Sequence, residues 1–559
     1  MTAAPQPAPF VSMVRAQHAS FGAVELDGRS LALGAVRAVA RDDVPARLTH
    51  LPGLRRRMDE CFAWMMADVG AGVPVYGCNS GYGAQASVVL NDGEEPDRFA
   101  MAARVSRAIS IVDVGVGPAL PRDVVRAGIL IRANMLLHGV SAVRYEDVEL
   151  LTRLLNSGLT PVVAQYGGLG ASGDLSHNAR VFSCLRRLPG AKVTTPDGTV
   201  RPAATALAGA GIPAFDPPPK AGLGFTNGDN FSTGVATLLL SDAADALLAS
   251  LALSAWTVEV LRGSDRSTHP LLAAVRPHPG QLESSRLLRF LLDGSELAAR
   301  ELAGHRPRPA GVSIQDGYSL RGVAQFHAVN LEKLVAAGKT LTVNLNSVSD
   351  NPLWVPPEHA TAGEEPWGWV SGANFLAAPP AEILDGLRKT LTQIVKLADR
   401  HLARLVSPHL NNGLPANLSD AESVTGCAFK GVQIQAGMFE VYATLLANPV
   451  TTLFGVHEEG NQDITTHAMT SGIVGFELLR VTRYALAQQM LALAQATDLR
   501  GGPHLLAPAS EKLYRFVRAR AEYVAEERPL CHDIEAVAAG FESGELGRVL
   551  RDDVLEGFA

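Results

Sequence analysis

The chain has 559 residues, of which 47% are hydrophobic and 19% charged, and its formal net charge at pH 7 is −7. A chain of this length builds more than one core, and this composition is typical of a large globular protein. The basic residues form no block, which argues against binding to nucleic acid or to an anionic membrane surface. The five cysteines are far apart and lack metal-ligand spacing, so we expect reduced thiols, a cytoplasmic protein and no metal.

The N-terminal part of the sequence predicts a tail and then short β elements. Residues 1–20 lack the charged and apolar regions of a leader peptide and are expected to be a flexible tail. Residues 24–41 predict a strand, an Asp-Gly turn, a second strand and a helix start. Residues 191–203 repeat the hairpin pattern with Pro-Asp-Gly at the turn. We therefore expect an N-terminal domain over residues 21–215 with short β-hairpins.

Long amphipathic helices dominate the rest of the chain. Apolar residues recur at helical spacing over 122–139 and 472–497. The most apolar stretch, 235–256, carries Ser and Asp at intervals, which favours a buried helix over a membrane span. The sequence predicts a mainly α protein with one large bundle of long helices over 216–500 and a C-terminal helical segment over 501–559.

A glycine-rich segment, YGGLGASGDLSHN at 166–178, admits several interpretations. Gly168, Gly170 and Gly173 match the GxGxxG pattern of dinucleotide sites, but the strand–helix alternation of such a fold does not follow. The second residue after Ser172 is Asp174 rather than glycine, so the GxSxG pattern of serine hydrolases fails. A simple glycine turn with Asp174 at the N-cap of a helix remains open.

The same segment also suits an unusual backbone reaction. Gly173 has no side chain, so its nitrogen can approach the carbonyl carbon of Ala171. Ring closure with loss of water would give an imidazolone, and loss of the Ser172 hydroxyl as a second water would leave an exocyclic methylene. The product would be an electrophile built from the chain itself, which helix N-termini aimed at it would make more electron-poor.

On these residues the sequence resembles the histidine/phenylalanine ammonia-lyase family, which includes related 2,3-aminomutases and uses the cofactor 4-methylideneimidazole-5-one (MIO). The resemblance covers about residues 24–500, and Ala171-Ser172-Gly173-Asp174 is its hallmark. Seven further segments are similar and stand in the family's order: VYGCNSGYG (75–83), GFTNGDNFSTG (224–234), RPHPGQ (276–281), QDGYSLR (315–321), NSVSDNPL (346–353), SGANFLAAP (371–379) and HEEGNQD (457–463). The resemblance implies a long-helix bundle of the fumarase/aspartase-like type and an MIO group formed from Ala171-Ser172-Gly173.

The resemblance also assigns roles to single residues. Tyr76 is the expected general base, which requires its phenol pKa to be lowered by nearby dipoles; a half-buried core tyrosine is the alternative. Arg321 lies one helical turn after Tyr318, so both can face one site, and its planar fork can hold a substrate carboxylate. Tyr318 would assist proton movement, and Asn227 would bond near the prosthetic ring or the carboxylate.

The remaining expected site residues line the pocket. Glu458 would face the substrate amine, with a solvated acid as the alternative, and Phe375 would form an aromatic wall unless it is a core residue. The other expected polar lining residues are Gln315, Asn346, Asn461 and Gln462. The sequence departs from the family's usual residues at Asp229, Asn230, Asn344 and Leu376 and after Arg321, which leaves the substrate open.

Ile111 and Val112 occupy the place where relatives carry the pair that contacts the substrate ring. Neither has a hydrogen-bonding group, so a buried phenol or imidazole would lose about 1–3 kcal/mol there. The pair therefore favours an apolar, aromatic or aliphatic, amino acid. The predicted reaction is elimination of ammonia from that L-α-amino acid; a 2,3-aminomutase or a binding protein without turnover remain alternatives.

The resemblance further implies a homotetramer whose active sites combine residues of several chains. We expect Tyr76 and Ser172 of one site to come from different chains. The expected partners are a small amino acid and further copies of this chain.

Overall fold

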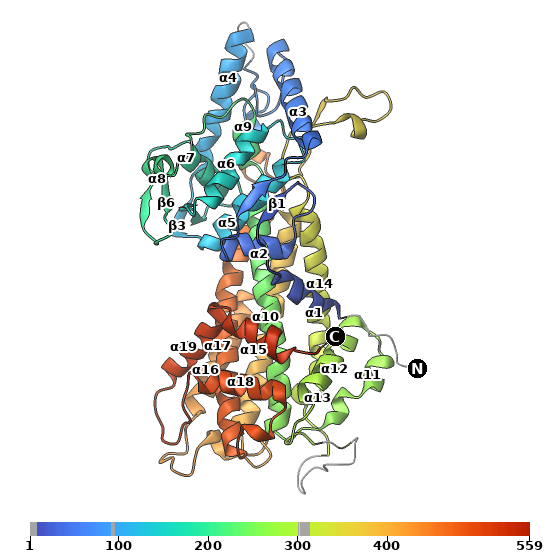
Figure 1. Ribbon diagram of the computed structural model, residues 1–559, viewed down its shortest axis with the longest axis vertical. Helices are drawn as coiled ribbons and strands as arrows, with labels where there is room; N and C mark the ends of the chain where they lie inside the picture. Colours follow the sequence, from blue (N-terminus) through green and yellow to red (C-terminus); the bar gives the residue numbers. More distant parts are fainter. Residues whose placement is uncertain (1–7, 91–94, 300, 302–313, 559) are drawn as a thin grey trace.

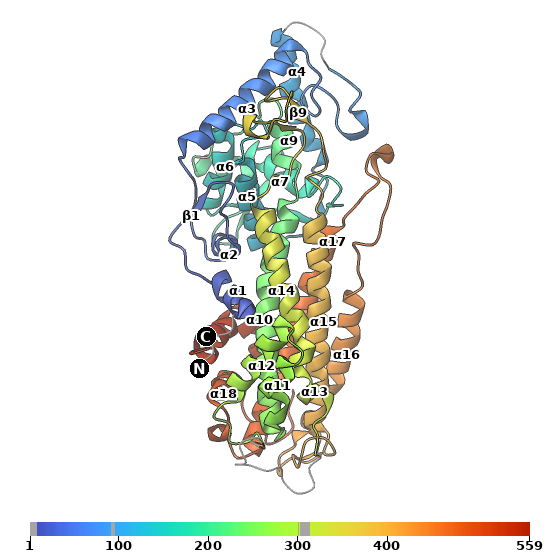
Figure 2. The same cartoon turned by 90° about the vertical axis from the view of Figure 1, so that its right-hand side faces the viewer.

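The computed structural model describes residues 8–90, 95–299, 301 and 314–558. The molecule is elongated, with an N-terminal domain at one end, long helices through its middle and C-terminal helices along its lower half (Figures 1 and 2). One buried apolar core runs from the N-terminal domain into the bundle. The prediction of a mainly α protein with a long-helix bundle is confirmed.

The N-terminal domain combines helices with short strands. Its helices are α1 (Pro9–Gln17), α2 (Leu33–Arg41), α3 (Pro52–Ala71), α4 (Glu95–Ala108), α5 (Arg122–Leu136), α6 (Tyr145–Asn156), α7 (Leu175–Leu185), α8 (Ala203–Gly209) and α9 (Ala221–Thr226). Its strands are β1 (Val24–Leu26), β2 (Ala46–Leu48), β3 (Val116–Ala119), β4 (Thr160–Pro161), β5 (Ala164–Tyr166), β6 (Lys192–Thr194) and β7 (Val200–Pro202).

One of the two predicted hairpins is present. Strands β6 and β7 pair antiparallel around the Asp197-Gly198 turn, as predicted. The hairpin predicted over 24–41 is wrong, because β1 pairs in parallel with β2 instead. The predicted Asp-Gly turn and helix start are present, since Gly28 has φ +82° and α2 begins at Leu33, but residues 29–32 between them form no strand. The partner of β1 is instead a strand that comes later in the chain.

The predicted tail is also wrong for part of its length. Residues 1–7 lie outside the described residues, but α1 begins at Pro9 and buries Phe10 and Val14 completely. The Glu283 carboxylate accepts hydrogen bonds from the backbone N–H groups of Phe10 (3.1 Å) and Val11 (2.9 Å). A carboxylate at a helix N-terminus accepts hydrogen bonds from backbone N–H groups that have no partner within the helix. Its negative charge is also attracted to the positive end of the helix dipole. A distant residue in sequence thus stabilises this helix.

The bundle consists of long helices that pack side by side (Figure 2). Its main helices are α10 (Asn230–Val260), α14 (Val323–Leu345), α15 (Ala378–Val406), α16 (Lys430–Leu446) and α17 (Ala468–Leu499). Shorter helices at its lower end are α11 (Pro270–Ala274), α12 (Pro279–Leu292) and α13 (Tyr318–Arg321). Helix α10 has the length and hydropathy of a membrane span, but 89% of its apolar window is buried inside the protein.

The segment between α14 and α15 returns from the bundle to the N-terminal domain. Strands β8 (Leu353–Trp354) and β9 (Trp369–Val370) pair antiparallel, and Trp354 and Trp367 pack with Cys61 and Cys78 in a separate apolar cluster. A boundary at residue 215 therefore does not divide the molecule cleanly. The C-terminal segment is helical as predicted, with α18 (Pro508–Arg518), α19 (Cys531–Glu542) and α20 (Glu545–Arg548).

Candidate active site

The Ala-Ser-Gly turn is compressed against a second chain segment. Gly173 has φ +66°, and a Cβ atom there would lie 2.3 Å from the carbonyl carbon of Gly228. The Asp174 N–H donates to the Gly228 carbonyl at 2.8 Å. A side chain at position 173 has neither the conformation nor the space it needs. Glycine is therefore required here by the tertiary structure as well as by the proposed backbone chemistry.

Two helices begin beside this turn. Helix α7 begins at Leu175 and α10 at Asn230. Asp174 occupies the N-cap position of α7, yet its carboxylate accepts from the backbone N–H (2.7 Å) and hydroxyl (2.5 Å) of Ser232 in α10. Burial raises the pKa of Asp174 to about 7. The carboxylate joins the two helix starts, and both N-termini present positive dipole ends near the turn.

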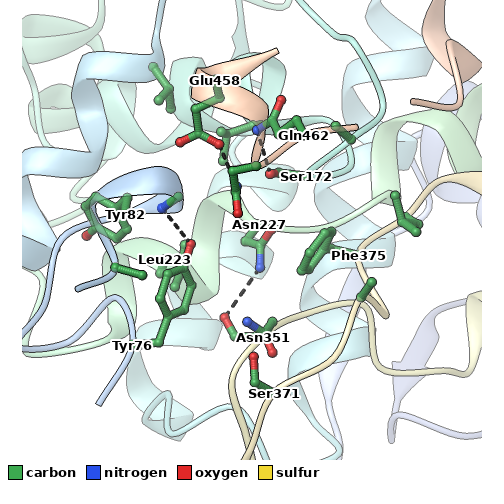
Figure 3. A pocket seen from close by; sticks show the side chains of 18 of the residues that line it. Tyr76, Tyr82, Ser172, Leu223, Asn227, Asn351, Ser371, Phe375, Glu458 and Gln462 are labelled. Atoms are coloured by element: carbon green, nitrogen blue, oxygen red, sulfur yellow. Dashed lines mark hydrogen bonds between the residues drawn. The ribbon is translucent and has the colours of Figure 1, made fainter. Parts of the chain in front are cut away.

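Ser172 opens into a cavity of about 630 Å³ (Figure 3). The structure brings together most of the predicted site residues in its lining: Tyr76, Ile111, Val112, Ala171, Ser172, Asn227, Phe375, Glu458, Asn461 and Gln462. Gly173 and Asp174 are buried behind the turn and shape it. Segments far apart in sequence therefore form one pocket in a single chain.

Tyr76 and Ser172 lie in the same pocket of one chain. The expectation that they come from different chains is wrong, because the loop of residues 75–83 and the Ala171-Ser172-Gly173 turn line one cavity within the chain. The phenol oxygen of Tyr76 accepts a hydrogen bond from the Gly83 N–H at 3.0 Å.

A general base requires a lowered phenol pKa, but within one chain the pKa of Tyr76 is raised. Burial and the Glu458 carboxylate raise the pKa of Tyr76, and the Gly83 N–H lowers it by less. Tyr82, the second tyrosine of the loop, donates to the Val105 carbonyl at 2.7 Å and anchors the loop. Tyr76 thus has the right position, and its ionisation needs a further positive group.

A strained turn brings Glu458 to the pocket. Glu458 and Glu459 both have positive φ, 52° and 55°, which is costly for residues with a side chain. The Glu458 carboxylate lies over Gly83, where a Cβ atom would meet its oxygen at 1.5 Å. Gln85 donates to Glu459 at 3.1 Å, so this turn contacts the Tyr76 loop twice. Glu458 lines the pocket and is at the same time exposed in the single chain.

Two amides complete the polar side of this turn. Asn461 donates to Glu458 at 2.8 Å, and Gln462 donates to the Ser172 hydroxyl at 3.3 Å. Both predictions of polar lining place these side chains correctly. Their bonds hold the carboxylate and the serine at fixed positions in the pocket (Figure 3).

Asn227 is held from below by a buried ion pair. Its amide nitrogen lies 3.4 Å from Asp350 Oδ1 and 3.4 Å from the Asn351 carbonyl. Asp350 forms an ion pair with Lys220 at 2.7 Å, and both side chains are essentially inaccessible to water. Because both neighbours accept hydrogen bonds, the amide nitrogen of Asn227 is directed toward Asp350 and Asn351.

Apolar side chains line much of the pocket and are called its apolar wall. They belong to Ile109, Ile111, Val112, Leu175, Leu223, Phe375, Leu376 and Ile464. Sequence reasoning found Ile111, Val112 and Phe375 but missed Leu175, Leu223 and Ile464, as well as the polar Asn351 and Ser371. Asn351 and Ser371 belong to the segments NSVSDNPL and SGANFLAAP, so their motif could have identified them. The leucines carry no signal that separates a pocket residue from a core residue.

The remaining predicted residues lie elsewhere. Gln315, Tyr318 and Arg321 line a different cavity of about 670 Å³ around α13, at the opposite end of the bundle from α7 and α9. Arg321 stacks on the Tyr318 ring, 4.5 Å from its centroid, as the predicted one-turn spacing requires. Within one chain these three residues do not meet Ser172.

Asn346 is a structural residue. It is the C-cap of α14, and it bonds the Leu31 N–H (2.8 Å) and carbonyl (2.9 Å). The helix-capping interpretation is the right one, and polar lining of the pocket is wrong. The residues that the structure describes hold no group of three or more His, Cys, Asp or Glu side chains that could bind a metal.

The fold and the pocket define a class: a long-helix carbon–nitrogen lyase whose pocket is built on an Ala-Ser-Gly turn. The sequence profile of the family "Aromatic amino acid lyase" matches residues 31–519. The chain belongs to this family, and it is an enzyme of the ammonia-lyase and aminomutase group.

Relatives with different reactions are similarly close to this chain. It is 32% identical over 551 residues to a tyrosine ammonia-lyase of Cupriavidus metallidurans, covering 95% of this chain and 98% of that one. It is 34% identical to a histidine ammonia-lyase of Anaeromyxobacter dehalogenans, covering 93% and 99%. The crystal structure of a tyrosine aminomutase from Streptomyces globisporus matches with a TM-score of 0.84 at 29% identity, covering 95% and 99%.

Proposed function

We propose that this enzyme eliminates ammonia from an L-α-amino acid with an apolar, aromatic side chain and releases the α,β-unsaturated acid. One observation carries the proposal: Ser172 and Tyr76 face one cavity that is also lined by a set of apolar side chains. That arrangement puts the proposed electrophile, a base and a hydrophobic side-chain pocket within reach of a single small molecule.

The residues of the turn fit an MIO group formed from Ala171, Ser172 and Gly173. Gly173 is held against Gly228 without room for a side chain, which suits the close approach that ring closure needs. The positive ends of two helix dipoles beside the turn would make the group more electron-poor and so a better electrophile. When present, the group supplies an electrophilic methylene that activates the amine as a leaving group.

The chain's own side chains would bind the substrate and move its protons. Tyr76 would take the β-proton, Glu458 would face the amine, and Gln462 would hold the Ser172 position. The pocket lining contains two acids, Glu458 and Asp463, and no lysine or arginine among the residues that the structure describes. A substrate carboxylate therefore lacks a cation in this pocket as one chain forms it.

We propose that a second copy of the chain supplies this cation, as part of a homotetramer. Tyr318 is 79% exposed and Arg321 is half-buried beside it, so this part of the surface is accessible to a neighbouring chain. The Arg321 guanidinium would hold the carboxylate, Tyr318 would assist proton movement and Gln315 would add a polar contact. The same positive charge would also lower the pKa of Tyr76, against the effect of burial.

The apolar wall supports an aromatic or other apolar side chain over histidine or tyrosine. Ile111 and Val112 offer neither donor nor acceptor, so a buried imidazole or phenol would lose about 1–3 kcal/mol. Cysteines Cys61, Cys78 and Cys184 are buried free thiols, which agrees with a reducing cytoplasm as the proposed location.

A 2,3-aminomutase is the second candidate. The hydrogen bond from Gln85 to Glu459 and the contact of Glu458 with Gly83 hold the Tyr76 loop over the pocket. A closed loop retains the unsaturated acid and ammonia for longer, which favours re-addition of ammonia at the β-carbon.

Incubation with each of the twenty amino acids and chiral mass spectrometry of the products tests the proposal. We expect release of an aryl acrylate from phenylalanine. A β-amino acid as the main early product would assign the aminomutase reaction, and turnover confined to histidine would contradict the role of Ile111 and Val112. A protein without turnover on any amino acid would contradict both enzyme assignments.

A further inference from the structure

Helix α13, which carries Tyr318 and Arg321, is a single turn of four residues. A helix this short is not stable by itself, because the hydrogen bonds of one turn do not offset the loss of conformational entropy. The orientation of the Tyr318 and Arg321 side chains must therefore be fixed by neighbouring elements. How well Tyr318 and Arg321 bind a substrate in a site shared between chains depends on how firmly this orientation is held.

Helix α15 holds this turn at Ser319. His401 Nε2 lies 2.7 Å from the Ser319 carbonyl oxygen, and Arg404 Nε donates to the Ser319 hydroxyl at 2.8 Å. His401 and Arg404 are three residues apart on α15 and so share one face. The Arg404 guanidinium also covers the backbone before the turn, because a Cβ atom on Gly317 would lie 1.7 Å from its Nη2.

The hydrogen-bond network fixes the proton on His401. The Thr257 hydroxyl donates to the Leu253 carbonyl at 2.6 Å and accepts from Gln489 Nε2 at 3.2 Å. The second hydrogen of that amide nitrogen points to His401 Nδ1 at 2.9 Å. Nδ1 is therefore an acceptor, and the ring carries its proton on Nε2, where it donates to Ser319.

The environment keeps His401 in this neutral form. The side chain is 1% exposed, and burial lowers its pKa to about 4. At neutral pH the ring is thus an uncharged donor, oriented by Gln489 of α17, which is itself held by Thr257 of α10. Three bundle helices, α10, α15 and α17, therefore converge through this network on the α13 turn.

We propose that His401 and Arg404 are positioning residues for Tyr318 and Arg321: by binding the Ser319 carbonyl and hydroxyl, they fix the turn that presents these side chains to the substrate carboxylate. This inference rests on the proposed function of Tyr318 and Arg321. Neither His401 nor Arg404 lines the cavity around α13, so both act through Ser319.

His327 provides a matched control. It is as deeply buried as His401, lies on α14 and contacts the Ser250 hydroxyl of α10 at 3.0 Å rather than the α13 turn. Replacing either histidine by leucine removes one buried imidazole and one or two hydrogen bonds. A loss of general stability would appear in both variants, whereas a positioning effect belongs to His401 alone.

The first experiment compares His401→Leu, His401→Gln and His327→Leu in the full-length enzyme. In His401→Leu we expect KM for the amino acid, and the inhibition constant of the acrylate product, to rise about tenfold, since both ligands offer a carboxylate to Arg321. His401→Gln retains a donor for Ser319 and should recover most of this loss. His327→Leu should leave both constants within about twofold of the wild type.

A second variant avoids the buried core. Gly317 has φ −65°, so Gly317→Ala is permitted by the backbone, but its methyl group must displace the Arg404 guanidinium. We expect Gly317→Ala to raise KM in the wild-type background. In the Arg404→Ala background, Gly317→Ala should leave KM unchanged. An equal effect of Gly317→Ala in both backgrounds would contradict a role of Arg404.

Hydrogen exchange of the backbone amides at 318–322 provides a readout that does not need turnover. We expect faster exchange there in His401→Leu and unchanged exchange in His327→Leu. Equal exchange and equal KM in the two leucine variants would overturn the proposal. A wild-type enzyme without turnover would instead overturn the proposed function, and the exchange experiment would still decide whether His401 holds the turn.

Discussion

The two ends of the molecule carry different halves of the expected chemistry. At the α7 end, Ser172, Tyr76 and Glu458 line one pocket and are held by hydrogen bonds from Gln462, Gly83 and Asn461. At the α13 end, an exposed Tyr318 and a half-buried Arg321 stack on one short turn. The described lining of the first pocket includes the Ala-Ser-Gly turn and two acids but no lysine or arginine. The lining of the second cavity includes Arg321. Each end is incomplete in the way that the other would correct.

Removing the serine at the first end should have the largest effect. Ser172→Ala deletes the hydroxyl whose loss would create the methylene, so we expect activity to fall by at least about a thousandfold. Intact-mass measurement should show the wild type lighter than its sequence by two waters, and Ser172→Ala without that difference. Ser371→Ala, at the same pocket, should keep the mass loss. A wild type of unmodified mass would refute the MIO assignment.

Coexpression of two inactive variants tests whether Ser172 of one chain and Arg321 of another form a shared site. Ser172→Ala and Arg321→Ala should each be nearly inactive as pure proteins. Coexpressed, the two chains should regain a measurable fraction of activity, because some sites would pair an intact Ser172 with an intact Arg321. Activity that stays at the level of the single variants, in mixed oligomers verified by tagged purification, would contradict shared sites.

The two tyrosines of the 75–83 loop separate chemistry from anchoring. Tyr76→Phe should lower kcat by roughly 10²–10⁴-fold, the range for loss of a general base, with the fold intact. Tyr82→Phe removes the bond to the Val105 carbonyl and should cost about 1 kcal/mol of stability, with kcat within about tenfold. Equal losses of kcat in both variants, measured by acrylate absorbance, would make Tyr76 a structural residue.

The apolar wall should respond to a single donor. Val112→His offers a hydrogen bond near the substrate ring, and we expect kcat/KM for tyrosine relative to phenylalanine to rise about tenfold. Ile464→His places the same side chain at another part of the pocket and should shift this ratio less. Competition assays with both amino acids measure the ratio directly. An unchanged ratio in Val112→His would place the ring elsewhere.

Asp174 should produce the smallest effect, a change in the pH dependence of stability. Its pKa in the folded protein is raised to about 7 from an ordinary 3.8, since burial disfavours the charged form. The folded state therefore holds this proton more tightly than the unfolded state, and its stabilising contribution is lost as pH rises from about 4 through 7.

Asp174→Asn has no proton to lose. The free energy of unfolding of the wild type, measured in urea between pH 5 and 8, should fall relative to that of Asp174→Asn as pH rises. A difference that stays constant over this range would show that Asp174 is ionised throughout in the folded protein. Ser232→Ala, which removes one donor to the carboxylate, should steepen the dependence.

Much of the fold was predictable, and the errors have one physical origin. The helical periodicity over 122–139 and 472–497 predicted α5 and α17 because amphipathic faces repeat with the helix. The strand pairing of β1 and the helix α1 were missed because their partners, β2 and Glu283, lie at a distance in sequence. Local turn chemistry cannot report on such contacts.

By itself, the sequence determined the chemistry that needs particular atoms in order along the chain. Ala171-Ser172-Gly173 can cyclise only as consecutive residues, and the one-turn spacing of Tyr318 and Arg321 follows from helix geometry. The tertiary structure alone decided which residues meet. It placed Tyr76 beside Ser172 of the same chain, made Asn346 a helix cap, and put Arg321 at the far end of the bundle. The physical reason is that side-chain type is local, whereas the distance between two pocket walls is set by the packing of whole helices.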